Sequence, residues 1–141
     1  MRFFVILVLL LTTTVASATS LESRDAAKQL TDQIMTKVVS GDIEGGLLLM
    51  KPYLIIPDSE FNVMLEQTKL NLPTIQGRFG KTLGSELIVE KQVGKSLLKI
   101  VHIQKFERHI LRWNFFFYKP NNKWVLNTFN FDDNIRSAFE E

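Results

Sequence analysis

Hydrophobic residues change their spacing along this chain near Gly80. Up to that point they recur every three or four positions, which is the period of a helix with one buried face. The pattern predicts a first helix over residues 21–39, which stops at Gly41. It also predicts a short second helix, which Asp42 caps and Pro52 ends.

A third helix is expected after the break at Pro57. Asp58 or Ser59 should cap its start, because short polar side chains accept hydrogen bonds from the first free backbone N–H groups. Pro73 should kink or end this helix, since proline removes one backbone hydrogen bond and clashes with the preceding turn.

After Gly84 the hydrophobic period is two, which predicts strands separated by short turns. The four expected strands form an antiparallel meander over residues 85–92, 95–106, 109–118 and 123–132. A short last helix is expected over residues 135–140. Helices followed by antiparallel strands indicate the α+β class. We therefore expect one cone-shaped domain, in which N-terminal helices pack on a curved antiparallel sheet of about four strands.

Turn chemistry predicts which strand face is buried. A two-residue turn of Glu107 and Arg108 pairs His102 with Trp113. A three-residue loop around Pro120 pairs residue 119 with residue 123, and so 117 with 125, 115 with 127 and 113 with 129. The inner face then carries aromatic side chains with polar side chains among them, namely His102, Gln104, Trp113, Phe115, Asn127 and Phe129.

The opposite face is expected to be solvated or to contact a second subunit. Its polar members are Lys99, Lys105, Arg112, Asn114, Thr128 and Asn130. Among them lie Phe116, Trp124 and Leu126, which we expect to form the contact if this face supports a homodimer.

The first 18 residues have the pattern of a signal peptide. Arg2 is followed by an unbroken apolar run over residues 3–11, and Ala16 and Ala18 occupy the two positions that a signal peptidase reads. The run is too short for a transmembrane helix, which needs about 20 apolar residues. We expect cleavage after Ala18 and a mature domain over residues 19–141 that is exported to a bacterial periplasm or secreted, with no membrane association.

Composition narrows the possible chemistry. The chain has 17 Lys and Arg against 15 Asp and Glu, so its net charge is +2, and loss of Arg2 lowers that by one. Such a small charge gives no electrostatic reason to expect a nucleic acid partner. There is no Cys and there are only two His, which excludes disulfides and thiolate chemistry and leaves little material for a metal site. We expect no cofactor and no metal.

The order of elements and several short stretches resemble the nuclear transport factor 2-like superfamily, a cone-shaped α+β fold. The stretches are Phe79-Gly80-Lys81 with Gly84, Phe117-Tyr118-Lys119-Pro120 leading to Trp124, and residues 129–133. The resemblance covers residues 22–140 and is closest to small exported bacterial members without a known activity. It implies a pocket between the helices and the sheet.

The catalytic patterns of that superfamily do not carry over. Ketosteroid isomerase uses a carboxylate base with a Tyr/Asp pair inside the cone, whereas Tyr53 and Tyr118 are predicted in a loop and on the outer face. Scytalone dehydratase-like chemistry uses a His pair, and only His102 is predicted inside. The resemblance therefore implies a fold and a pocket rather than an activity.

Three functions remain open at this point. The first is a non-enzymatic domain that binds a small apolar or amphipathic ligand, with the inner-face set as its pocket. The second is an interaction or dimerisation module that uses the outer face. The third is an isomerase or dehydratase in which His102 is the base, although a hydrogen-bonded core histidine is the plainer interpretation of that residue.

Overall fold

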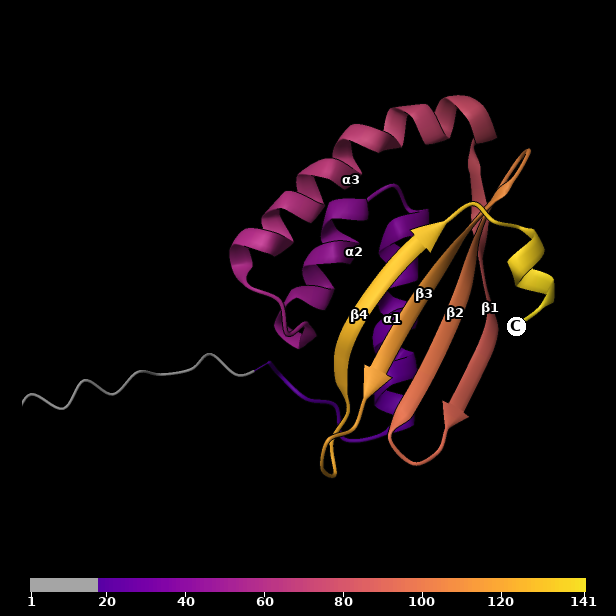
Figure 1. Ribbon diagram of the computed structural model, residues 1–141. Helices are drawn as coiled ribbons and strands as arrows, with labels where there is room; N and C mark the ends of the chain where they lie inside the picture. The colour runs from indigo at the N-terminus through magenta and orange to yellow at the C-terminus, as the bar shows by residue number, and fades with distance from the viewer. Residues whose placement is uncertain (1–17) are drawn as a thin grey trace, which may run out of the picture.

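The computed structural model describes residues 18–141 and has helices first and strands afterwards, as the α+β prediction requires (Figure 1). The predicted signal peptide lies outside these residues, apart from Ala18. The elements are α1 (Arg24–Val39), α2 (Ile43–Met50), the 3-10 turn η1 (Lys51–Tyr53), α3 (Asp58–Phe79), β1 (Thr82–Val93), β2 (Leu97–Phe106), β3 (Ile110–Tyr118), β4 (Val125–Asp132) and the 3-10 turn η2 (Arg136–Phe139). Within residues 18–141, we find no helix that is both long enough and apolar enough to cross a membrane.

Helix α1 ends at Val39 as predicted but begins at Arg24, three residues after the predicted start, and α2 begins directly after its predicted cap. Ser23 caps α1, since its side chain accepts a hydrogen bond of 3.0 Å from the backbone N–H of Ala26. Gly41 follows the helix with a φ of 91°, which only glycine adopts at low cost. Asp42 then caps α2 by accepting the N–H of Gly45 at 2.8 Å, which confirms its predicted role.

Helix α3 differs from the prediction at both ends. Pro57 is its N-cap residue, so Asp58 and Ser59 lie inside the helix and make no side-chain cap. Pro73 does not end it, because α3 continues to Phe79 and arches over the rest of the molecule (Figure 1). The helix tolerates proline here because residues around it are exposed, so water can satisfy the backbone carbonyl that loses its partner.

The sheet has the order β1-β2-β3-β4 and is antiparallel throughout. In the β2–β3 pair, His102 lies opposite Trp113, and Ile100 lies opposite Phe115, which confirms that register. The inner face packs against α1, α2 packs on α1, and side chains from all three bury one hydrophobic core.

The predicted β3–β4 register is wrong. Phe117 pairs with Leu126 rather than with Val125, because the connection from β3 runs one residue further than a three-residue loop allows. A bulge then adds Asn127, so that Phe115 pairs with Phe129 rather than with Asn127. Asn127 is consequently exposed, and Leu126 points inward and is fully buried.

The predicted outer face also needs correction. Trp124 is buried and exchanges two backbone hydrogen bonds with Leu21, so neither it nor Leu126 is available for a subunit contact. Arg112 and Asn114 are also buried, although both lie on the outer face as predicted. They are covered because the chain after β4 turns back across this face (Figure 1).

Candidate functional site

His102 lies in the centre of the core between the sheet and α1. Its Nε2 is 2.9 Å from the hydroxyl oxygen of Thr31 and 3.8 Å from a carboxylate oxygen of Asp32. The Thr31 hydroxyl donates its one hydrogen to the carbonyl of Lys28 at 2.8 Å, so its oxygen accepts a hydrogen bond from His102. His102 Nε2 therefore carries a proton.

The pKa of His102 is lowered to about 4. Burial is the largest cause, because a charged ring loses its hydration in the core, and the nearby ammonium of Lys28 acts in the same direction. The carboxylate of Asp32 opposes this shift without overcoming it. A base with so low a pKa is poorly matched to proton abstraction near neutral pH.

Gln104 and Trp113 hydrogen-bond each other in the same layer. The indole N–H of Trp113 donates to Oε1 of Gln104 at 3.1 Å, and Nε2 of Gln104 donates to the hydroxyl of Thr82 at 3.0 Å. Gln104 and Trp113 are almost fully buried. These polar atoms bind one another, so they are not free to converge on a ligand as the sequence suggested.

The aromatic members of the predicted set divide between core and edge. Phe115 is fully buried and stacks on Phe129, with 6.4 Å between ring centroids. Phe129 is only half-buried, because β4 is an edge strand. The structure therefore brings together five of the six predicted residues and separates Asn127 from them.

A cleft opens beside this core, between the second half of α3, the N-terminal end of β3 and the C-terminal end of β4. We call it the α3–β4 cleft; its volume is about 250 Å³, and it is lined by Asn71, Thr74, Ile75, Arg78, Phe79, Leu111, Phe131, Asp132 and Asp133. Phe131 forms part of the cleft wall and stacks on Trp113 behind it, with 4.9 Å between ring centroids. A second hollow, of about 20 Å³, is lined by Ile75 and Leu111 together with Gln104, and it is too small to hold an organic ligand.

The sequence contained part of the signal for this cleft. Leu72, Ile75 and Phe79 follow one another at helical spacing, and together they form an apolar stripe on α3. The expectation that Pro73 breaks the helix concealed the stripe, because only an unbroken helix aligns those three side chains.

The C-terminal end of α3 is fastened to the β2–β3 hairpin. Arg108 donates to the carbonyls of Arg78 at 3.1 Å and Gly77 at 3.2 Å, and Glu107 accepts the N–H of Lys81 at 2.9 Å. These two hairpin residues therefore bind the end of the helix. They hold the helix end in place at the mouth of the cleft.

The mouth itself carries both charges and apolar surface. The Arg78 guanidinium lies over the ring of Phe79, 5.5 Å from its centroid, and Asp133 lies on the opposite side of the opening. Within residues 18–141, no group of three or more His, Asp or Glu side chains is placed to hold a metal ion. The arrangement suits noncovalent binding of a molecule with an apolar body and a polar end.

Comparisons with known proteins give no match: no family model, no curated protein and no solved structure matches this chain.

Proposed function

We propose that this chain is an exported, non-catalytic domain of the nuclear transport factor 2-like type that binds a small apolar or amphipathic molecule. The proposed binding site is the α3–β4 cleft. The observation that carries the proposal is an apolar opening between one helix and an edge strand, with charged and polar groups at its rim. Its volume of about 250 Å³ is just below the usual range of small-molecule sites, so it suits a small ligand or part of a larger one.

The packing of α3 supports this location. From residue 69 to residue 78 no side chain of α3 is buried, and Leu72 and Ile75 are only half-buried. An apolar ligand in the cleft would bury Ile75 and Phe131 further, which provides a hydrophobic driving force for binding.

The core residues support a binding role rather than a catalytic one. His102 is buried, neutral and hydrogen-bonded to Thr31, so it is unsuited to act as the base of an isomerase or dehydratase. Gln104 and Trp113 likewise satisfy each other. These contacts favour a rigid wall that stands behind the cleft.

The first experiment is native mass spectrometry of residues 19–141, purified from the exported fraction of the native host. We expect a bound mass in addition to the chain. The second is a fluorescence titration with 1-anilinonaphthalene-8-sulfonate, an anionic aromatic probe of apolar surface. We expect saturable binding at a single site.

Two variants of α3 locate the bound probe. Ile75→Glu places a carboxylate in the cleft and should weaken binding by at least about tenfold, since an apolar ligand cannot compensate a desolvated charge. Leu70→Glu adds the same charge to the same helix at a side chain that is 77% exposed and outside the cleft, so it should leave affinity unchanged. Absence of probe binding, or equal effects of the two variants, would overturn the proposal.

A further inference from the structure

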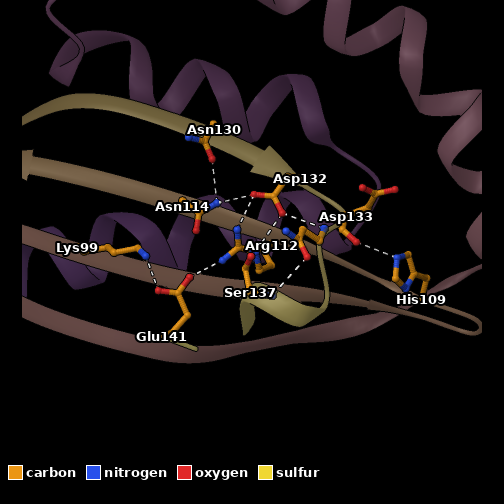
Figure 2. A network of polar contacts seen from close by, with 10 residues as sticks. Lys99, His109, Arg112, Asn114, Asn130, Asp132, Asp133, Ser137 and Glu141 are labelled. Carbon is orange, nitrogen blue, oxygen red and sulfur yellow. Dashed lines mark hydrogen bonds and ion pairs between the residues drawn. The ribbon is translucent and has the colours of Figure 1, made fainter. Parts of the chain in front are cut away.

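The chain after β4 forms a cover over the outer face of the sheet, and the side chain of Glu141 holds it there (Figure 2). One carboxylate oxygen of Glu141 accepts a hydrogen bond from Arg112, and the other accepts from Lys99. The Glu141 carboxylate therefore binds two cations on neighbouring strands, Lys99 on β2 and Arg112 on β3. Only 9% of the Glu141 side chain is exposed.

Without Glu141, Asp132 would still balance the charge of Arg112, but Lys99 would have no carboxylate partner among the described residues. Arg112 also binds Asp132 through two hydrogen bonds of 3.0 and 2.9 Å, which balance its charge and fix its guanidinium plane. Its third nitrogen is left for Glu141. Lys99 binds only Glu141 among the carboxylates of the described residues, so the site carries one excess positive charge that matches a single carboxylate.

The rest of the cover binds the sheet weakly. In the part of the chain that the structure describes, the hydrogen bonds of residues 134–140 stay within that segment or reach only residues 132 and 133. Phe139 is 85% exposed, so its ring adds little to the attachment. His109 Nε2 also donates to the backbone carbonyl of Asp133 at 2.9 Å, where the segment leaves β4, so beyond that point its polar attachment to the sheet is the side chain of Glu141.

The floor of the site has an unused polar atom. Asn114 is 3% exposed, and its amide nitrogen donates to Asn130 at 2.8 Å and to Asp132 at 3.2 Å. Its Oδ1 has no hydrogen-bond partner within residues 18–141, and in Figure 2 it points away from Asn130. Such an atom is costly unless a donor reaches it.

We propose that Lys99, Arg112 and Asn114 form a carboxylate-binding site for an acidic segment of a partner polypeptide, and that Glu141 occupies this site in the free chain. The occupant present in the structure shows what fits: a carboxylate at the end of a short, weakly held turn. A partner segment would replace Glu141 and could supply a backbone N–H to Asn114. This site lies on the face of the sheet opposite α1 and α2, so the inference does not depend on ligand binding in the α3–β4 cleft.

The test adds an acidic segment to the domain as a separate peptide. The probe is a fluorescent peptide of residues 134–141 with an amidated C-terminus, and binding is followed by fluorescence anisotropy. In the full domain, Glu141→Gln should raise the affinity for this peptide by at least about tenfold, because the site is then no longer filled from within. Near-UV circular dichroism checks that the variant keeps its fold.

A second pair of variants tests the site itself. In the Glu141→Gln background, Lys99→Gln should lower affinity by at least about fivefold, because it removes one of the two cations. Lys105→Gln removes an exposed lysine from the same strand, where the nearest carboxylate is 3.9 Å away, and should have no effect. A peptide with Gln at its last position should bind no better to the Glu141→Gln domain than to the unchanged one.

Three outcomes would overturn the proposal. The first is equal peptide affinity, or none, for the unchanged domain and the Glu141→Gln domain. The second is an equal effect of Lys99→Gln and Lys105→Gln. The third is concentration-dependent dimerisation of the unchanged domain that the peptide reverses, since the occupant would then be a second copy of this chain.

Discussion

The ring of His102 is neutral because burial disfavours its charged form, and the stability of the domain therefore depends on pH. In the unfolded chain its pKa is near the ordinary 6.5, whereas in the folded chain it is about 4. The unfolded state therefore binds more protons between these values, so folding becomes less favourable as pH falls. The stability that the neutral ring supports is fully present above pH 6.5 and is lost as pH falls from there toward 4.

We expect this one residue to reduce the free energy of unfolding by about 3 kcal/mol between pH 7.5 and pH 4, since each pKa unit corresponds to about 1.4 kcal/mol. The measurement is urea unfolding of the wild-type domain and of His102→Gln across that range. The difference between their stabilities should shrink by about that amount toward pH 4. A difference that is independent of pH would contradict the assigned environment of His102.

The sequence predicted the direction of these core side chains but not their partners. The turn of Glu107 and Arg108 determined the register that places His102 beside Trp113. The partner of His102 is Thr31, which is 71 residues away on α1, and no local pattern encodes that contact. The inner polar residues were therefore interpreted as pocket-lining groups, whereas packing makes them a closed set.

Among the elements, the least predictable features were those that depend on one inserted or tolerated residue. The bulge at Asn127 shifts the pairing of β4 with β3 by one residue from Thr128 onward. The alternation of hydrophobic residues does not reveal a bulge until the partner strand is known. The path of α3 through Pro73 is another such feature. Local propensity predicts that proline breaks the helix, but the helix continues because water can bind the carbonyl that proline leaves without a partner. Both features shape the α3–β4 cleft.

Two glycines near the end of α3 test how firmly this helix end is positioned. Gly80 has a φ of 87°, and a Cβ there would lie 2.4 Å from Oε2 of Glu107. We expect Gly80→Ala to destabilise the domain by about 2 kcal/mol or more, through backbone strain and loss of the contact that Glu107 makes.

Gly77→Ala is the matched control. Gly77 lies inside α3, and a Cβ there would meet no atom within 4 Å. Alanine should stabilise the domain by about 0.5–1 kcal/mol, because it lowers the entropy cost of forming the helix. Urea unfolding midpoints should move in opposite directions for the two variants. A shift in the same direction would mean that the turn at Gly80 is not held as described.

For the whole molecule, sequence periodicity was sufficient to predict the layers. The change from period 3.6 to period 2 predicted helices on one face of a four-stranded antiparallel sheet, which the structure confirms. Periodicity could not predict which surfaces remain open. That depends on how α3 arches and on the return of residues 133–141 across the outer face, and both are set by contacts between distant parts of the chain.

This uneven packing predicts uneven local stability. Helix α1 contacts β1, β2 and α2, and its buried side chains are Ala27, Leu30, Thr31, Ile34, Met35 and Val38. Residues 69–78 of α3 bury no side chain, so the helix can open there without disturbing the core. Amide hydrogen exchange measured by mass spectrometry should show residues 69–78 exchanging at least about tenfold faster than residues 27–38.

Exchange in the presence of a ligand links this opening to the proposed function. A molecule bound in the α3–β4 cleft contacts the closed helix and is released when residues 69–78 open, so it should slow exchange in that segment. Residues 27–38 exchange through deeper unfolding and serve as the internal reference. Equal exchange in both segments without ligand would show that α3 is fixed along its whole length, and entry to the cleft would then require no opening of the helix.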